Sequence, residues 1–403
     1  MLKTDVVVIG AGPAGSMAAK HAALGGANVV LIDKKSEIGT PKRCAEGVYD
    51  EGFKWLNIEP DERWIAQRIY GATLHSPDGN SFTVTSEDVP VQGFILERKV
   101  FDKHMAMDAA RAGAKIMIKT LVTDIKRNEN GFILSCDSIE GTIEVEAKIA
   151  ICADGPESIM AKKLGINSTT PQNMMSCAQF EMCNVDYNDD EKIEFYLGQD
   201  VALKGYAWIF PKGNGVANVG LGVTGNTDKT AYEYIMDFIE KCPATKNAQP
   251  IEMNIGGDPI NGLIEKIYYD NLLICGDAAG QVNPIEGGGI IEGMLGGMAA
   301  GDVAAKAIKE ENYSKERLHE YYEKYSELSF NLIETLPAAR DIVYSFTDDE
   351  YNKILSVANT IDLKNISKRD VLKVVFKLPP TLTTKLIKLL KIVFPKQMKS
   401  ILF

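Results

Sequence analysis

The chain has 403 residues, of which 45% are hydrophobic and 25% charged, and these proportions exclude the disordered and fibrous classes. Its formal net charge of −11 argues against a general nucleic-acid-binding protein. The charge is uneven, because residues 371–403 contain seven lysines and no acid, which leaves −18 on the first 370 residues.

The cysteines and histidines predict neither disulfides nor a metal site. Seven cysteines are scattered without a CxxC pair, which is typical of reduced thiols in a cytoplasmic protein, and the four histidines do not occur at metal-ligand spacing. No signal peptide is expected, and no apolar run approaches the roughly 18 residues needed to span a bilayer. We expect a cytoplasmic protein, or one that lies on a membrane without crossing it.

The N-terminal segment predicts a dinucleotide-binding βαβ unit. Its parts follow in the order strand 5–9, Gly10, Gly12, Gly15, helix 16–24, strand 28–32 and Asp33. In such a unit the first glycine allows the tight turn, the second the approach of a pyrophosphate and the third close helix packing. The helix N-terminus offers N–H groups to phosphates, and Asp33 is placed to accept hydrogen bonds from ribose hydroxyls.

Three aromatic residues alternate along a predicted strand over 206–210. Tyr206, Trp208 and Phe210 share one face of it, because strand side chains alternate with a period of two. In that row they can form the wall of a slot for a flat, apolar chain, or they can pack a domain core. The residues by themselves leave both interpretations open.

A second glycine pattern, Gly220, Gly222 and Gly225, does not predict another nucleotide site. The helix expected after it leads into a segment over 242–250 that is not a strand, so the βαβ unit is incomplete. We interpret the pattern as a glycine-rich strand and expect one dinucleotide site only.

A late strand–turn–helix segment indicates which dinucleotide binds. A strand over 271–275 runs into Asp277, and a glycine-rich helix over 290–309 follows Gly288 and Gly289. A flavin needs such a second element, because its ribityl chain and ring extend beyond the pyrophosphate. Asp277 can accept a hydrogen bond from a ribityl hydroxyl, and the helix N-terminus can stabilise charge on the reduced ring. The alternative is an ordinary tight turn.

A basic amphipathic helix is predicted after the Pro379–Pro380 pair. Its apolar arc and its basic arc consist of Leu382, Leu386, Leu389, Leu390 and Val393, and of Lys385, Lys388 and Lys391, respectively. Such a helix can lie in the interface of an anionic membrane, or it can pack on the acidic body of the protein. Both alternatives stay open.

Together these segments resemble the FAD-dependent superfamily of the p-hydroxybenzoate hydroxylase type. Two further motifs carry the resemblance: the Asp154–Gly155 pair, and residues 98–102, RKVFD, whose arginine, Arg98, contacts FAD in that superfamily. The resemblance implies a mixed α/β fold. It has a Rossmann-type FAD-binding domain, an antiparallel-sheet substrate domain and a helical C-terminal region.

Two segments narrow the resemblance to the geranylgeranyl reductases, especially the archaeal enzymes that saturate the isoprenoid chains of ether lipids. Residues 41–47 are similar to that family's Cys-x-x-Gly loop beside the flavin. Residues 206–211, YAWIFP, are similar to its P-x-x-Y-x-W-x-F-P signature, with Leu203 in place of the first proline. The family match favours a substrate wall at the three aromatic residues.

The resemblance places Cys44 near the flavin, where it affects substrate fit or chemistry without an assigned role as proton donor. Lys42 and Arg43 can lower the pKa of its thiol or hold an anion nearby, and the alternative is a small buried residue. The full set of expected FAD contacts is Gly10, Gly12, Ala14, Gly15, Asp33, Cys44, Ala45, Gly47, Arg98, Val122, Asp154, Asp277, Gly288, Gly289 and Ile290.

The implied reaction adds a hydride from reduced FAD to one alkene carbon and a proton to its neighbour. An isoprene double bond carries no electron-withdrawing group, so the site has to orient it against the flavin and exclude water. The expected partners are a prenylated lipid, an external electron donor (a ferredoxin-like protein, NAD(P)H or another) and an anionic membrane surface, with no nucleic acid. The expected location is peripheral, on the inner face of the cell membrane.

The expected FAD-binding domain is discontinuous. It covers 1–70, 98–170 and 255–310, with a substrate sheet over 71–97 and 171–254 and a helical region with its basic tail over 311–403. Two other functions stay open at this point. One is a flavin-dependent monooxygenase or epoxidase acting on an apolar substrate, and the other is a non-catalytic flavoprotein that binds prenyl lipids.

Overall fold

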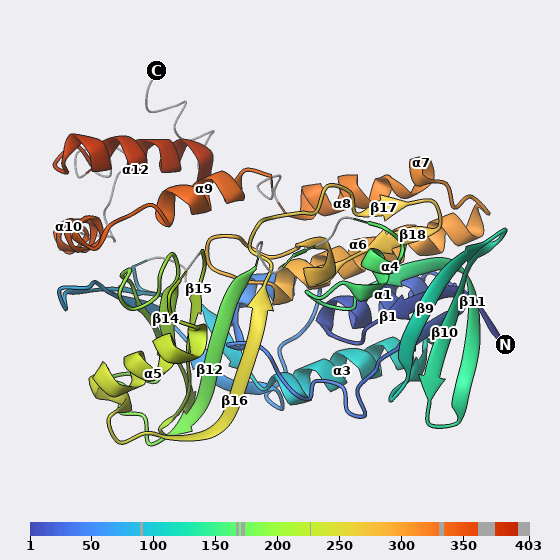
Figure 1. Cartoon of the computed structure of the whole chain (residues 1–403), viewed down its shortest axis with the longest axis horizontal. Helices are drawn as coiled ribbons and strands as arrows, with labels where there is room; N and C mark the ends of the chain where they lie inside the picture. Colours follow the sequence, from blue (N-terminus) through green and yellow to red (C-terminus); the bar gives the residue numbers. More distant parts are fainter. Residues whose placement is uncertain are drawn as a thin grey trace.

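The structure is a computed structural model of the chain. It describes residues 1–88, 92–166, 169–170, 174–225, 227–329, 334–361 and 375–393. Figure 1 shows a sheet with β12 and β14–β16 beside a second layered unit that contains β1, α1 and α6. The last helices lie above the first of these sheets, and the N-terminus lies at the opposite end of the molecule.

The βαβ unit forms the centre of an eight-stranded sheet. β1 (Leu2–Ile9) pairs in parallel with both β2 (Val29–Ile32) and β11 (Gly141–Cys152), and α1 (Pro13–Leu24) connects β1 to β2 as predicted. The remaining strands are β8 (Lys115–Met117), β9 (Leu121–Asn128), β10 (Gly131–Ser138), β17 (Tyr268–Tyr269) and β18 (Leu272–Ile274). The last four residues of β1 are buried, as expected for a strand covered on both faces.

Helices pack against this sheet and surround its first strand–helix turn. α6 (Ile290–Lys309) has the predicted bounds and packs along α1, while α3 (Arg98–Arg111) packs on the other side of α1. The remaining short elements here are α2 (Asp50–Trp55), α4 (Ile159–Lys163) and the turn η3 (Gly276–Ala279). The largest apolar core of the molecule lies between these helices and the sheet.

A seven-stranded sheet carries the aromatic strand. Its order is β16 (Gln249–Asp258), β12 (Met175–Cys183), β15 (Val216–Val223), β14 (Tyr206–Gly213), β13 (Lys192–Tyr196), β5 (Gly71–His75) and β6 (Ser81–Thr85). The prediction of an antiparallel sheet is wrong at one pair, because β13 and β5 run parallel. More than a hundred residues separate these two strands, so a crossover replaces the hairpin that an antiparallel pair would allow.

The glycine pattern at 220–225 lies in and just after β15, as predicted for a strand. α5 (Ala231–Lys241) follows and begins with a capping box in which Thr230 and Glu233 satisfy each other's backbone N–H groups. The one-turn helix η2 (Pro243–Thr245) then leads to β16. α5 packs on β12 and β15 around a second apolar core.

A three-stranded sheet joins segments that the sequence assigned to different domains. β7 (Gly93–Leu96) pairs with β3 (Gly47–Tyr49) and β4 (Ile65–Ile69), not with the substrate sheet that was predicted to include residues 71–97. The strand is short and apolar, so its composition does not tell which partner it pairs with. This pairing bears on the site, because β3 directly follows the Cys44 loop and β7 therefore helps to hold that loop in place.

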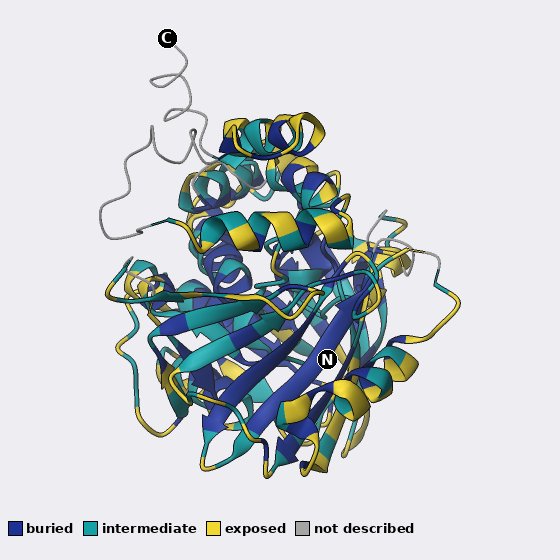
Figure 2. Cartoon of the chain, turned by 90° about the vertical axis from the view of Figure 1, so that its left-hand side faces the viewer, coloured by how far each residue is buried: buried dark blue, intermediate teal, exposed yellow. Residues whose placement is uncertain are grey.

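The C-terminal region is helical in its described residues, with α7 (Lys315–Leu318), α8 (Glu320–Leu328), α9 (Leu336–Val343), α10 (Asp348–Ala358) and α12 (Pro380–Val393). Leu382 is fully buried, and Leu386 and Leu389 pack on the same cluster as Phe346 of the body. Lys385 forms an ion pair with Glu350. The first part of the apolar arc of α12 therefore packs on the protein, and Figure 2 shows buried and exposed residues alternating around the helices above the sheet.

Candidate flavin and substrate site

The glycine loop leaves open space at Gly12. A Cβ at Gly12 would meet no atom within 4 Å, whereas a Cβ at Gly15 would lie 1.8 Å from the carbonyl oxygen of Gly10. Gly12 is also the N-cap of α1, and no side chain caps that end. The N–H groups of the first turn therefore face a space that a pyrophosphate fits, while Gly15 lets α1 pack directly on the loop.

Asp33 is anchored beside this loop. One of its carboxylate oxygens accepts a hydrogen bond from the backbone N–H of Ala11 at 2.8 Å, and the other accepts one from the N–H of Lys35 at 2.8 Å. The side chain is buried. Each carboxylate oxygen keeps a lone pair for a further donor, so the position suits the ribose contact that the sequence predicts.

Asp154 has an unsatisfied oxygen. Its Oδ2 accepts the backbone N–H of Met160 at 2.9 Å, but its Oδ1 is buried and has no hydrogen-bond partner among the described residues. Burial raises the pKa of Asp154. Buried polar atoms are nearly always paired, so this oxygen fits a hydroxyl or N–H group of a bound cofactor. Together with the space at Gly12, it shows that the residues present fit a dinucleotide.

Arg98, the first residue of α3, lies between the Cys44 loop and the turn η3 that carries Asp277. Its guanidinium donates to Asp102 at 2.6 and 2.9 Å, and its backbone N–H donates to Glu46 at 2.8 Å. Burial raises the pKa of Asp277 to about 6, and the charge of Arg98 opposes that rise. Arg98 therefore lies close enough to Asp277 to bias its charge, and it also lies near Cys44.

The thiol of Cys44 is not activated by its neighbours. Burial raises its pKa, and only Arg98 and hydrogen bonds oppose this. Of the two roles that the sequence leaves open for Lys42 and Arg43, the structure does not favour the lowering of this pKa, because Lys42 forms buried ion pairs and Arg43 pairs with Glu157 at 2.8 Å. The two cations are neutralised by carboxylates and leave Cys44 a neutral, partly buried thiol.

The three aromatic side chains lie on one face of β14, as predicted. The ring centroids of Tyr206 and Trp208 are 5.8 Å apart, and those of Trp208 and Phe210 are 6.2 Å apart. Phe195 of the neighbouring β13 packs edge-on against Tyr206 at 5.3 Å and against Phe210 at 5.5 Å. These four rings, which we call the aromatic wall, share an apolar cluster with Ala45.

The aromatic wall is attached to the Cys44 loop. The indole N–H of Trp208 donates to the side-chain oxygen of Gln179 at 2.9 Å, and the Gln179 amide donates to the carbonyl of Cys44 at 2.9 Å. A Cβ at Gly47 would lie 2.9 Å from the Phe210 ring. The wall therefore faces the loop that the family resemblance places beside the flavin, which the strand pattern alone does not determine.

A buried network of charges fastens the same loop to the substrate sheet. Glu46 is fully buried and accepts from Lys42 at 2.8 Å, from Lys212 at 2.9 Å and from the amide of Asn218 at 2.9 Å. Both lysines also pair with Glu181. Burial alone raises the pKa of Glu46, but the charges of Lys212 and Lys42 bring it below its usual range. Sequence reasoning missed this network, because its members are far apart in the chain and have no motif.

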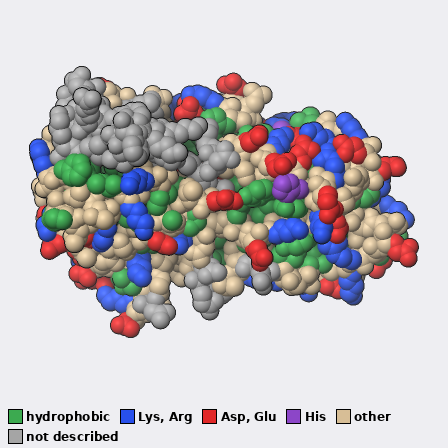
Figure 3. All heavy atoms as spheres, turned by 90° about the horizontal axis from the view of Figure 1, so that it is seen from above, with side chains coloured by type: hydrophobic (Ala, Val, Ile, Leu, Met, Phe, Trp, Pro, Cys, Tyr) green, Lys and Arg blue, Asp and Glu red, His purple; other side chains and the backbone are tan. Residues whose placement is uncertain are grey.

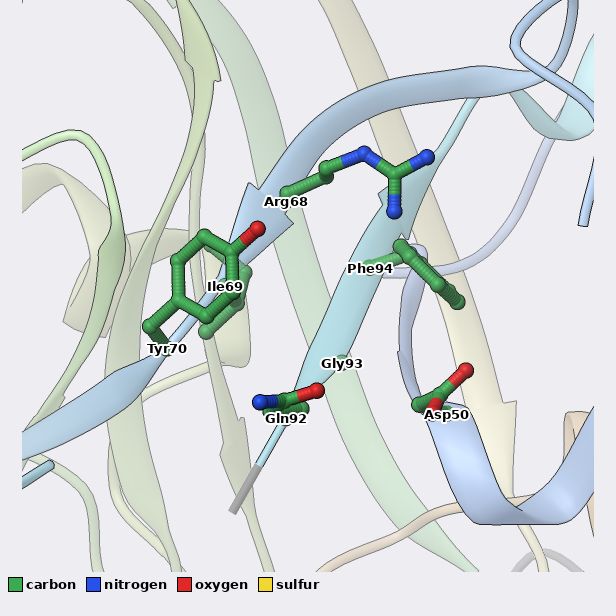
Figure 4. Close-up of a pocket in the computed structure, with 7 residues that line it drawn as sticks. All are labelled: Asp50, Arg68, Ile69, Tyr70, Gln92, Gly93 and Phe94. Carbon is green, nitrogen blue, oxygen red and sulfur yellow. The ribbon is translucent and has the colours of Figure 1, made fainter. Parts of the chain in front are cut away.

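The other predicted contacts lie at the edges of this region. Ala14 lies in α1, Gly288 and Gly289 precede α6, and Ile290 is its first residue. Val122 is buried on β9 within the core of the eight-stranded sheet. Figure 4 shows a separate pocket between β4 and β7, where Arg68 lies over the ring of Phe94; none of the predicted site residues lines it.

The described residues offer neither a metal site nor a membrane-spanning helix. They contain no group of three or more His, Cys, Asp or Glu side chains that could hold a metal ion. Within the same ranges, no helix is both long enough and apolar enough to cross a bilayer.

A glycine loop at a helix N-terminus, a second strand–turn–helix element and an adjoining sheet define an FAD-dependent oxidoreductase. Comparisons with known proteins agree. Residues 5–62 match the family model of an FAD binding domain, and residues 173–257 match that of the geranylgeranyl reductase catalytic domain. The FAD cofactor and the mixed α/β fold predicted from the sequence are confirmed.

The chain belongs to the geranylgeranyl reductase family. It is 50% identical to digeranylgeranylglycerophospholipid reductase 1 of Methanothermobacter thermautotrophicus, over 96% of this chain and 98% of that protein. It is 41% identical to the digeranylgeranylglycerophospholipid reductase of Methanocaldococcus jannaschii, over 92% and 95%. The crystal structure of a geranylgeranyl bacteriochlorophyll reductase-like protein from Thermoplasma acidophilum matches with a TM-score of 0.88 and 32% identity, over 96% and 100%. A flavin-dependent brominase, at 18% identity and a TM-score of 0.69, shares the fold alone.

Proposed function

We propose that the protein saturates the isoprenoid double bonds of geranylgeranyl chains in archaeal-type ether membrane lipids. The observation that carries the proposal is the aromatic wall, which faces the Cys44 loop and is joined to it through Gln179. A row of aromatic rings along one strand suits a long apolar chain. The names of the relatives at 50% and 41% identity support the same substrate class.

FAD, when bound, supplies the hydride. The chain's own residues hold the cofactor, orient the alkene and exclude water. Gly12, the N-terminus of α1, Asp33 and Asp154 are proposed to hold the nucleotide half, and Arg98, Asp277 and the N-terminus of α6 the flavin half. The remaining proposed cofactor contacts are Gly10, Ala14, Gly15, Cys44, Ala45, Gly47, Val122, Gly288, Gly289 and Ile290. The proposed FAD-binding unit comprises 1–70, 98–170 and 259–310 together with β7, because β7 pairs with β3 and β4, and β16 up to Asp258 belongs to the substrate sheet.

The decisive measurement is anaerobic. We would reduce the purified holoenzyme with dithionite, add digeranylgeranylglycerol phospholipid, and follow flavin reoxidation together with lipid mass. The proposal expects reoxidation coupled to a gain of two hydrogens for each saturated bond. If the flavin stays reduced and the lipid mass is unchanged, the substrate assignment is wrong, and oxygen-dependent chemistry or non-catalytic lipid binding becomes the next hypothesis.

Cys44 is proposed to shape the slot next to the reacting bond. Its thiol is partly buried and neutral, and its carbonyl is held by Gln179. In the same anaerobic assay, Cys44→Ala is expected to retain FAD and to change the reduction rate or the pattern of partly saturated products. Turnover and products identical to those of the wild type would contradict this role.

Electrons are proposed to come from a separate donor, either a ferredoxin-like protein or a diffusing reductant such as NAD(P)H. The glycine pattern in β15 supports this, because it does not form a second nucleotide-binding loop. Its glycines lie in a strand, where they make room for the side chains of Trp208 and Met175. The test is to supply each donor anaerobically and to measure the rate of flavin reduction. Fast reduction by one donor, at a rate that matches turnover, identifies it.

A peripheral position on an anionic membrane is proposed for the face that carries α12. Lys388 and Lys391 are exposed on that helix, and Phe376 nearby is 62% exposed. Figure 3, which views the molecule from this side, shows basic side chains next to apolar ones on the part of the surface near α12. Each lysine near such a surface contributes roughly 1 kcal/mol.

Charge reversal tests the membrane contact without exposing the apolar arc. Replacing both Lys388 and Lys391 by Glu is expected to weaken binding to anionic liposomes by more than about 30-fold, the loss expected from neutralising the two lysines alone. The matched control replaces Lys241 and Lys246, exposed at the other end of the substrate sheet, in the same way. Equal binding of the two double variants would contradict the proposal.

A further inference from the structure

The end of β16 places a carboxyl group between the flavin side and the aromatic wall. β16 belongs to the substrate sheet and ends at Asp258, where the chain returns toward η3 and α6. A Cβ at Gly287 would lie 2.5 Å from Oδ2 of Asp258 and 3.8 Å from the hydroxyl of Tyr206. The Asp258 carboxyl is therefore next to both the loop before α6 and the first ring of the wall.

The loop next to Asp258 is the one proposed to face the flavin. A Cβ at Gly289 would lie 3.3 Å from Oδ1 of Asp277, so Gly287 and Gly289 have one carboxyl group beside each of them. Gly287 has a φ of +73°, a conformation that favours glycine and that brings the backbone close to Asp258. An alkene lying between the wall and this loop would meet the Asp258 carboxyl.

Polar groups at this junction lack partners within the protein. The hydroxyl of Tyr344 is buried and makes no hydrogen bond to any described residue. It lies close enough to Asp258 for that carboxylate charge to raise its pKa. The side chain of Asp258 also has no hydrogen bond in the described part of the chain. Unpaired polar groups next to each other indicate room for a ligand or a water molecule.

The surroundings of Asp258 favour its protonated form. Burial raises its pKa well above the usual carboxyl range, and the negative charge of Asp277 raises it further. The groups that face it are Asp277 on η3, Tyr206 on β14, Cys177 on β12 and Tyr344 after α9. Each of these is neutral or acidic. The guanidinium of Arg340 on α9 also lies in this neighbourhood, where it donates to the carbonyl of Ile260 at 2.7 Å and pairs with Asp341 rather than with Asp258.

We propose that Asp258 is the catalytic acid that supplies the proton in the reduction of the alkene, an assignment that rests on the proposed function. The O–H bond of Asp258 breaks and a C–H bond forms at one alkene carbon, while the hydride that FAD supplies forms the C–H bond at the other. The π bond is lost, and the lipid gains two electrons and two hydrogens. Asp258 is left as a carboxylate and regains its proton from water, for which the Tyr344 hydroxyl offers a hydrogen-bond site.

Neighbouring acidic groups fit this role less well. The hydroxyl of Tyr206 already donates its proton to the carbonyl of Glu286. The carboxyl of Glu286 accepts the side-chain amide of Asn283 at 3.1 Å. Burial raises the pKa of both the Cys44 and the Cys177 thiols, which makes them weaker acids than a carboxyl group. Asp258 combines an unpaired carboxyl with a position beside the wall.

The first test compares Asp258→Asn with the wild type as dithionite-reduced holoenzymes mixed with digeranylgeranylglycerol phospholipid. FAD content and the flavin spectrum are expected to be unchanged, and flavin reoxidation is expected to slow by about 10²–10⁴-fold. The wild-type rate should fall as the pH rises through the pKa of Asp258, whereas the variant should lose this dependence. Glu194→Gln is the matched control, because Glu194 is a buried carboxyl of the substrate sheet that bonds Tyr196 and His75, and strand alternation places it on the opposite face of β13 from Phe195.

Two further measurements separate this proposal from the proposed function. Infrared difference spectra of the lipid-free holoenzyme should contain a protonated-carboxyl band at pH 7 that Asp258→Asn removes and Glu194→Gln does not. Acetic acid should restore part of the reoxidation rate to Asp258→Ala. If the wild type reduces the lipid but Asp258→Asn keeps its rate and pH profile, or if no protonated-carboxyl band depends on Asp258, Asp258 is not the acid. If the wild type does not reduce the lipid, the proposed function fails and this assignment fails with it.

Discussion

The nucleotide loop and the aromatic wall are built in opposite ways. All parts of the nucleotide loop lie within residues 4–33, and the two ends meet through the hydrogen bond between Ala11 and Asp33. The aromatic wall is held by residues that are far apart in the sequence. Gln179 joins Trp208 to the Cys44 loop, and Cys44 lies 135 positions before Gln179 in the chain. A local motif can be recognised in the sequence, whereas a site assembled from distant strands has to be seen folded.

The difference also appears in how each region is stabilised. Backbone N–H groups and glycines form the nucleotide loop, so its geometry follows from the chain itself. The wall and the Cys44 loop depend on the charges buried around Glu46, which join β12, β14 and β15 to the loop. Buried charges are costly unless each one is paired, and this makes the assembled region the more sensitive one to a single change.

The largest expected effect comes from a substitution in the charge network that holds the wall and the Cys44 loop together. Glu46→Gln removes the carboxylate that neutralises Lys42 and Lys212, and we expect it to lower the free energy of unfolding by about 3–5 kcal/mol. Urea unfolding of the holoenzyme measures this. Glu62→Gln, at the exposed Arg68–Glu62 pair, is the control and should move the midpoint little. Equal midpoints for the two variants would show that the network adds no stability.

The same variant changes the response to acid. Because Lys212 and Lys42 bring the folded-state pKa of Glu46 below the ordinary carboxyl value of 4.5, its contribution is present above that value. It is lost as the pH falls through the lower, folded-state pKa. Wild-type stability is therefore expected to fall more steeply than that of Glu46→Gln as the pH drops below 4.5.

The next largest effect is expected from a substitution in the nucleotide loop. Gly12→Val places its Cβ in the open space at the glycine loop, where that atom meets no protein atom within 4 Å, so we expect FAD affinity to fall by more than about 100-fold while circular dichroism stays native. FAD content after gel filtration measures it. Gly225→Ala, in the glycine pattern that follows β15, is the control and should keep its FAD. Loss of FAD from both variants would mean that the two glycine patterns are not distinct in function.

The smallest effect is expected from substitutions at two glycines of β15, one of which lies against the aromatic wall. A Cβ at Gly220 would lie 2.5 Å from the rigid indole ring of Trp208, whereas a Cβ at Gly222 would meet the flexible side chain of Met175. Gly220→Ala is expected to displace the wall and to lower kcat/KM for the lipid about tenfold with FAD content unchanged. Gly222→Ala should change kcat/KM less. Equal kcat/KM values would show that the position of Trp208 does not set substrate fit.

Much of the fold can be predicted from periodicity and local motifs. The βαβ unit, the bounds of α6 and the common face of Tyr206, Trp208 and Phe210 follow from spacing alone. The pairing of β7 and the parallel pair of β13 and β5 do not, because short apolar strands are compatible with several partners.

The candidate site divides in the same way. Asp33 and Asp154 could be assigned from motifs, whereas Asp258 and Gln179 have no motif and become relevant only through their neighbours. The direction of the Cys44 pKa shift also depended on the fold. Adjacent basic residues suggest a lowered value, but burial raises it and the two cations pair with carboxylates elsewhere.

The sequence by itself determined the cofactor, the family and the elements of the flavin-binding unit, because each motif that indicates them is a short run of glycines, acids and strand residues that can be recognised without its neighbours in the fold. Only the tertiary structure decided what faces what. It turned the aromatic wall toward the Cys44 loop, packed Leu382 of the basic helix on the body and brought Asp258 beside Gly287. Contacts between distant segments depend on packing and on the pairing of buried charges, which only the folded chain brings together.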